Sequence, residues 1–133
     1  MTTDENETLA LRRYLANHVE TATPVQRLLM LFDYLSKDFA GARAGFAEGN
    51  FEQISTHLIH AQEILFALRD PLDATTDLGR SLASLYEFAI DRLVVANFRK
   101  QIGPLDEVQP LIEQIAAANR AAAAASVPAG VGA

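Results

Sequence analysis

A chain of 133 residues with a net charge of −6 and no cysteine is long enough for one domain with its own hydrophobic core. The negative charge disfavours non-specific binding to nucleic acid and to anionic membranes, and the lack of cysteine excludes disulfides, thiolate metal sites and cysteine nucleophiles. Acidic residues near the N-terminus and the absence of a long apolar run argue against a signal peptide and a membrane span. We therefore expect a soluble, cytoplasmic protein.

Residues 1–20 are expected to form a mobile N-terminal segment. Residues 7–19 have helical propensity, but a helix of this length is only marginally stable in water unless it packs against the rest of the chain. We therefore expect a short N-terminal helix that docks loosely.

Thr23 and Pro24 predict the start of the first long helix, because they pair an N-cap residue with proline at the first helical position. Apolar residues then recur in steps of four and three up to about Ala47, which is the heptad spacing of a bundle helix. They are Leu28, Phe32, Leu35, Phe39, Ala42 and Phe46. Gly49 and Asn50 are expected to end this helix and cap the next.

Two further helices are predicted over 51–69 and from about Thr76 to Lys100. Pro71 ends the first of them, because proline disfavours helix at the residue before it. Both carry more apolar side chains than one core-facing stripe needs. The surplus comprises Ile59, Ile64, Phe66, Tyr86, Ile90, Val94 and Phe98. It predicts either a thick core or a groove for an amphipathic partner, and the pattern alone leaves the two about even.

A fourth long helix is predicted after Gly103 and Pro104, with Pro110 expected to kink it or delay its start. Its apolar positions are Leu105, Val108, Ile112 and Ile115. Residues 121–133, rich in alanine and glycine, are expected to form a flexible tail. Residues 21–120 then make the folded unit, and the predicted fold is all-α: an antiparallel up-down four-helix bundle.

His57 and His60 are the main candidates for chemistry, because they lie three residues apart on one predicted helix, with Glu63 one turn further on. A di-iron bundle needs Glu-x-x-His pairs, and the sequence contains none. We therefore interpret both histidines as solvated surface residues and predict neither a metal ligand nor a catalytic residue. A histidine phosphotransfer carrier is the alternative function, and a bundle that dimerises through its apolar surplus is a third interpretation.

Motifs between residues 14 and 118 resemble, in order, those of the flagellin-specific export chaperone family (FliS). The first are Tyr14-x-x-Asn17-x-Val19-x-Thr21-Ala22-x-Pro24 and Met30-Leu31-Phe32-Asp33. The later ones are Leu82-x-x-Leu85-Tyr86-Glu87-Phe88, Arg92-Leu93-Val94-x-Ala96-Asn97 and Leu105-x-Glu107-Val108. The resemblance implies a cytoplasmic bundle, without catalytic activity or cofactor, that binds the disordered C-terminal segment of new flagellin. It also implies that premature polymerisation is prevented and that flagellin is delivered to the flagellar type III export gate protein.

The resemblance, read together with the apolar surplus, implies a set of flagellin-binding residues: Ile64, Leu68, Leu72, Tyr86, Ile90, Leu93, Val94 and Asn97. Tyr14 matches the family's N-terminal tyrosine and is expected to cap the groove or to dock at the export gate. The face through Leu82, Leu85 and Ala89 is expected to join the core. The neighbouring face, around Tyr86, Ile90 and Val94, is expected to receive flagellin, and residues 7–19 to cover it when no client is bound.

Overall fold

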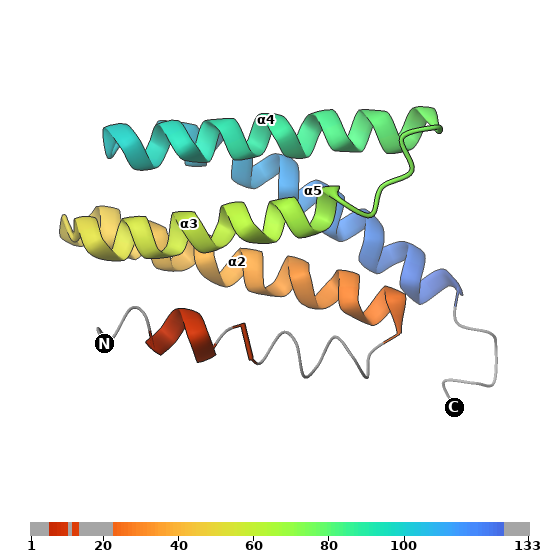
Figure 1. Cartoon of the computed structure of the whole chain (residues 1–133), viewed down its shortest axis with the longest axis horizontal. Coiled ribbons are helices and arrows are strands. Elements are labelled where there is room, and N and C mark those ends of the chain that lie inside the picture. The colour runs from red at the N-terminus through yellow and green to blue at the C-terminus, as the bar shows by residue number, and fades with distance from the viewer. Residues whose placement is uncertain (1–5, 11, 14–22, 127–133) are drawn as a thin grey trace.

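The computed structural model describes residues 6–10, 12–13 and 23–126, and every regular element within these ranges is a helix (Figure 1). The four long helices are α2 (Pro24–Glu48), α3 (Phe51–Arg69), α4 (Asp77–Arg99) and α5 (Gly103–Ser126). Residues 6–10 and 12–13 are helical as well. The all-α bundle with a short N-terminal helix is therefore confirmed. Within the described ranges, none of the helices combines the length and the apolar character that crossing a bilayer demands.

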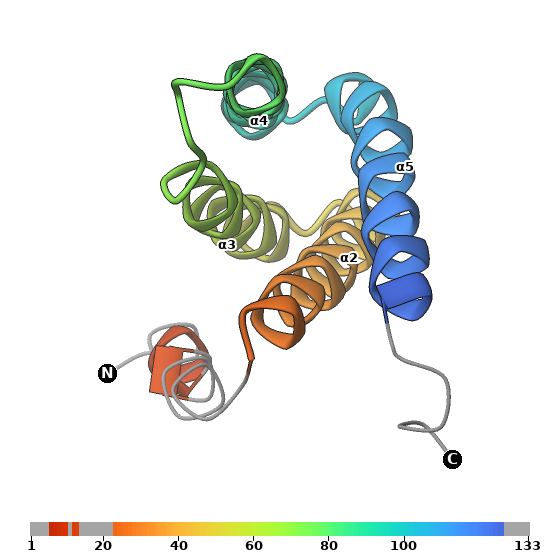
Figure 2. The same ribbon diagram turned by 90° about the vertical axis from the view of Figure 1, so that its right-hand side faces the viewer.

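The helices form a four-sided arrangement when viewed end-on (Figure 2). Helix α2 packs against α3 and α5, and α4 packs against the same two helices from the opposite side. Helix α5 runs obliquely behind the other three (Figure 1). The N-terminal helical residues lie beside α2 and α3, on the side that faces away from α4 and α5 (Figure 2).

The ends of α2 follow the predicted capping residues. The Thr23 hydroxyl accepts a hydrogen bond from the Gln26 backbone N–H at 3.1 Å, and the Gln26 side chain accepts one from the Thr23 N–H at 3.0 Å. Gly49 ends the helix in the left-handed conformation, with φ of 66°. Asn50 then caps α3 by accepting from the Gln53 N–H at 3.0 Å. The predicted bounds of both helices are confirmed.

The loop before α4 folds closely over the first turn of that helix. Thr76 caps α4 by accepting from the Gly79 N–H at 3.0 Å. A Cβ atom on Gly79 would lie 1.9 Å from the Asp73 carbonyl oxygen, so this position admits no side chain without a backbone shift. Hydrogen bonds from the hydroxyl and backbone N–H of Thr75 lower the pKa of Asp73.

The core takes one apolar stripe from each long helix, and the residues predicted for α2 and α5 lie in it or pack against it. Its largest fully buried side chains are Phe32, Phe39, Leu35, Ile54, Leu58, Leu65, Leu93, Leu105 and Val108. Helix α5 begins at Gly103, so Pro110 does not delay its start; this proline lies inside the helix and is exposed, which leaves water able to reach the freed carbonyl group. The helix continues to Ser126, so the domain boundary expected at residue 120 falls within it.

The expected core face of α4 is wrong in part. Ala89 is buried as expected, and Leu82 is half-buried and packs against the core, but Leu85 is half-buried outside the core cluster. The buried stripe of α4 instead consists of Gly79, Tyr86, Ala89, Ile90, Leu93 and Ala96. Helix α4 packs against α3 on one side and α5 on the other, so its most buried stripe is the one that points between these two neighbours.

Charged side chains join α5 to its two neighbours. Arg43 of α2 donates to Gln109 Oε1 at 2.6 Å and pairs with Asp106 at 2.8 Å. Arg92 of α4 makes two hydrogen bonds to the Glu107 carboxylate, at 3.0 and 3.1 Å. Arg92 and Glu107 belong to two separate motifs of the resemblance, and the structure brings them together as a bidentate pair between helices.

Candidate functional site

Most of the residues expected to bind a client lie in the core of the bundle. Ile64, Leu68, Tyr86, Ile90 and Leu93 are all buried. A fully buried side chain supports the surface above it but does not itself offer much area to a partner. Burial of the Tyr86 phenol raises its pKa, because removal from water disfavours the ionised form.

The remaining members of this set lie at or near the surface. Val94 is 46% exposed, and Leu72 and Asn97 are half-buried. Tyr14 lies outside the described residues. The structure therefore leaves Val94, with parts of Leu72 and Asn97, as the directly accessible portion of the expected site.

The seam between α3 and α4 is marked at both ends by polar contacts. At one end the Ser55 hydroxyl donates to Asn97 Oδ1 at 2.9 Å. At the other end Arg69 and Glu87 form an ion pair at 3.9 Å. Side chains three or four residues away from one of these four residues, on the same helix, therefore also lie next to the seam.

Exposed apolar side chains follow the outer side of this seam. On α3, Ile59 and Phe66 are seven residues apart and so share one face of the helix. On α4, Val94 comes three residues before Asn97, and Phe98 lies one turn beyond Val94. The exposed fractions run from 40% for Phe66 to 87% for Phe98. We call Ile59, Phe66, Val94 and Phe98 the α3–α4 ridge; all four belong to the apolar surplus seen in the sequence.

A second apolar feature lies between the start of α2 and the end of α3. It is a pocket of about 460 Å³, lined by Pro24, Arg27, Leu28, Leu31, Ala67, Leu68 and Pro71. Leu68 is one of the residues expected to contact a client, whereas no sequence pattern singles out Leu28 and Leu31 for binding. Leu28 belongs to the predicted apolar stripe of α2 and Leu31 precedes the next member of it, and periodicity does not reveal that both are only half-buried at this end of the bundle.

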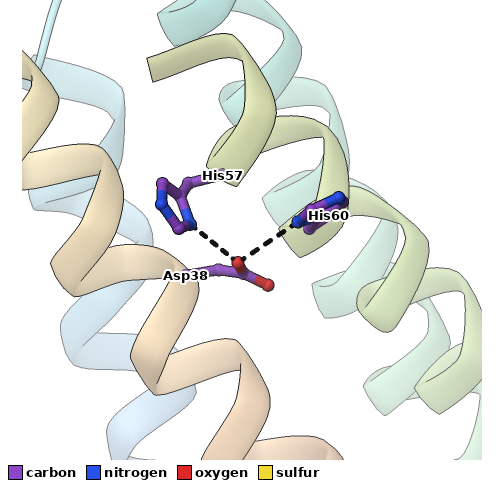
Figure 3. Close-up of side chains that lie close together, drawn as sticks. All are labelled: Asp38, His57 and His60. Carbon is purple, nitrogen blue, oxygen red and sulfur yellow. Dashed lines mark hydrogen bonds and ion pairs between the residues drawn. The ribbon is translucent and has the colours of Figure 1, made fainter. Parts of the chain in front are cut away.

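The histidines of α3 are not the solvated surface residues expected from the sequence. His60 is buried, and both rings face Asp38 of α2, which is itself only 6% exposed (Figure 3). Asp38 Oδ1 lies 3.0 Å from His57 Nδ1 and 3.7 Å from His60 Nδ1. The Asp38 carboxylate raises the pKa of His60, and this effect outweighs the lowering caused by burial.

Glycine at position 41 makes room for this cluster. A Cβ atom on Gly41 would come within 2.4 Å of the His57 ring, so the imidazole packs directly on the backbone of α2. His57 keeps about a third of its side chain exposed, with 32% accessible. A phosphoryl carrier needs an accessible ring nitrogen, and the burial of His60 removes one of the two residues considered for that role.

The N-terminal segment contacts α3 next to this cluster. Thr8 Oγ1 lies 2.9 Å from His60 Nε2, and the Arg12 guanidinium donates to Glu63 at 3.3 Å. Thr8 and Ile59 share the lining of a surface pocket of about 260 Å³. The described part of the segment thus borders the α3–α4 ridge at Ile59, whereas Val94 and Phe98 stay exposed.

The family described as "Flagellar protein FliS" matches residues 7–126 of this chain. Two relatives are each described as "Flagellar secretion chaperone FliS". The relative from Bacillus subtilis is 33% identical over 96 residues, which is 72% of this chain and 72% of the relative. The relative from Salmonella typhimurium is 31% identical over 103 residues, or 75% of this chain and 76% of the relative. The match includes all four long helices and confirms the resemblance: this chain belongs to the FliS family.

Proposed function

We propose that this chain is a flagellar secretion chaperone that binds the disordered C-terminal segment of newly made flagellin. Binding prevents premature polymerisation, and the chaperone delivers the subunit to the flagellar type III export gate protein. Family membership supports the chaperone role, since both relatives carry that description. The observation that carries flagellin binding is the α3–α4 ridge, a row of exposed apolar side chains on a chain of net negative charge.

The ridge suits an apolar segment that is not yet folded. Covering a Leu-sized or Phe-sized side chain contributes roughly 1.5–3 kcal/mol, so a few such contacts offset the ordering of a disordered partner. Phe66 and Phe98 offer large apolar area, and Val94 lies between them along the seam. The buried residues Tyr86, Ile90 and Leu93 contribute indirectly, because they pack α4 against α3 and so fix the positions of the ridge side chains.

The pocket that contains Leu68 is a second anchor for the same client. Leu28, Leu31 and Leu68 give it an apolar lining, and Leu72 lies just beyond the end of α3. An extended segment reaches both places, because a chain spans about 3.3 Å per residue when extended. In this proposal the client follows α3 lengthwise, with the ridge as its principal contact.

Titration calorimetry with a flagellin C-terminal peptide tests the proposal. Phe98→Ser should weaken binding by roughly tenfold or more, because it removes one large apolar contact. Phe88→Ser is the matched control, since Phe88 is an exposed phenylalanine of the same helix that does not belong to the ridge. A strongly negative heat-capacity change should accompany wild-type binding. Equal affinity of all three proteins would contradict docking on the ridge.

Delivery to the export gate is tested separately with the N-terminal tyrosine. Tyr14→Ala should weaken binding of the export gate protein while the flagellin peptide binds with unchanged affinity. A loss of peptide affinity of the same size as in Phe98→Ser would instead assign Tyr14 to the client site.

A further inference from the structure

Asp38, His57 and His60 gather three metal-ligand side chains at a point where α2 meets α3 (Figure 3). One ligand atom from each lies within 4.8 Å of the others. We propose that this cluster binds a divalent transition-metal ion, with zinc as the best match. The proposal is independent of the client surface, since none of the three residues belongs to the α3–α4 ridge.

The distances suit a shared ion. Two ligand atoms bound to one tetrahedral zinc ion at about 2.0–2.2 Å lie roughly 3.3–3.6 Å apart. Asp38 Oδ1 is 3.0 Å from His57 Nδ1 and 3.7 Å from His60 Nδ1, which brackets that separation. The two nitrogens face the same carboxylate oxygen from neighbouring turns of α3, so modest side-chain rotations bring all three atoms around one ion.

The second oxygen of Asp38 is an independent indication of a ligand. Oδ2 is buried and has no hydrogen-bond partner among the described residues. The Asp38 side chain as a whole is more than nine-tenths buried. An unpartnered buried carboxylate oxygen is unfavourable, because it has lost its hydration without replacement. A cation between Asp38 and the histidines would compensate the buried negative charge directly.

The groups around the imidazole rings of His57 and His60 orient these rings in the way that is usual for metal-binding histidines. Histidines that bind an ion through one nitrogen generally donate the other N–H to an oxygen nearby. Thr8 Oγ1 lies 2.9 Å from His60 Nε2, so with Nδ1 turned to the ion, Nε2 carries the proton and donates it to this hydroxyl. The bare backbone at Gly41 fixes the other ring, and the exposed part of His57 leaves a route for the ion and a completing water.

The ligand set selects the class of metal. Two imidazole nitrogens with one carboxylate suit zinc and its late first-row neighbours, whereas magnesium and calcium prefer oxygen ligands throughout. With three protein ligands and space for a fourth, the site resembles an open rather than a closed coordination sphere. The contact through Thr8 also links the ion to the position of the N-terminal segment.

Competition titration with a chromophoric chelator tests the site on the full-length, untagged chain after removal of bound metal. We expect saturable binding of one zinc ion per chain. Asp38→Asn and His60→Gln should abolish it, while His18→Gln, which removes the histidine outside the cluster, should leave it unchanged. Zinc should raise the melting temperature of the wild-type chain and of His18→Gln, and not that of the other two variants.

Changes at less buried positions, and cobalt in place of zinc, test the site even if a buried variant fails to fold. His57→Gln changes a partly exposed residue and should weaken zinc binding, and Thr8→Val should weaken it about tenfold through the lost orienting contact. Cobalt in place of zinc should give the intense visible absorption of a low-coordinate, nitrogen-containing site. The proposal is wrong if the wild-type chain shows no saturable zinc binding, or if folded His57→Gln binds zinc as tightly as wild type. The cluster would then be a set of polar contacts between α2 and α3 that holds no metal.

Discussion

The Asn97 amide of α4 accepts a hydrogen bond from the Ser55 hydroxyl of α3 at 2.9 Å, and the Lys100 ammonium donates to both oxygens, at 2.6 Å to Ser55 and 2.5 Å to Asn97. Asn97 was expected to contact flagellin, and the structure also gives it a part in joining two helices. Lys100 ends α4 in the left-handed conformation, with φ of 52°, which places its side chain beside this pair.

Replacing Asn97 should therefore affect stability. Asn97→Ala leaves the partly buried Ser55 hydroxyl without its acceptor and takes from Lys100 one of its two acceptors. We expect the free energy of unfolding to fall by about 1–2 kcal/mol. Urea denaturation measures this loss. Combined with Ser55→Ala, the losses should be less than additive, since both changes remove the same contact. Full additivity would show that the two side chains act independently.

Leu93 and Val94 are adjacent in the chain but should behave oppositely. Leu93 is fully buried, so Leu93→Ala should lower the free energy of unfolding by about 2–5 kcal/mol. Val94→Ala changes an exposed position and should alter stability by no more than about 0.5 kcal/mol. Calorimetry on the folded proteins should then show weaker flagellin-peptide binding for Val94→Ala. Weaker binding for Leu93→Ala alone would move the contact away from the ridge.

Tyr86 should make the fold less stable at high pH. Its pKa is raised by burial, so the folded chain keeps the phenol protonated at a pH where the unfolded chain has released the proton. The free energy of unfolding therefore falls as pH rises above about 10, and Tyr86 has no such effect at neutral pH. Thermal unfolding between about pH 9 and about pH 11 should show a smaller decline for Tyr86→Phe than for wild type. Identical declines would mean that Tyr86 ionises freely in the fold.

Gly79 should tolerate no side chain. Gly79→Ala brings a Cβ atom against the Asp73 carbonyl, and we expect a loss of about 1–3 kcal/mol as the loop is displaced. Gly103→Ala is the control, since a Cβ there meets no atom within 4 Å. It should change stability little or raise it slightly, because alanine favours helix. Equal melting temperatures for the two variants would contradict the close approach at the start of α4.

The helices themselves could be predicted because their signals are local. Thr23, Pro24, Gly49 and Asn50 act on backbone groups within a few residues, and the apolar spacing of α2 matches a single stripe. The faces of α4 could not be predicted in the same way. Leucines and phenylalanines occur nearly all round this helix, so several stripes fit the pattern, and the choice depends on where α3 and α5 lie.

The polar cluster could not be found from the sequence for a related reason. His57 and His60 were recognised as a pair, but Asp38 lies on another helix, beside the core residue Phe39. Periodicity leaves it undecided whether such a flanking residue faces water or a neighbouring helix. The rotation of α2 about its own axis decides this, and that rotation results from packing across the whole interface.

The same cluster has a consequence for how α2 and α3 are aligned. Heptad stripes on two antiparallel helices repeat every seven residues, so apolar packing alone changes little when one helix slides past the other by a full heptad. The buried Asp38 carboxylate distinguishes these alignments, because a slide by one heptad would remove both histidines from its side. The residues seven positions away from them are Ile64 and Ala67 in one direction and Asn50 and Gln53 in the other, and none of these can carry a positive charge. Asp38 therefore fixes the register of the pair, and with it which exposed side chains of α3 stand beside those of α4.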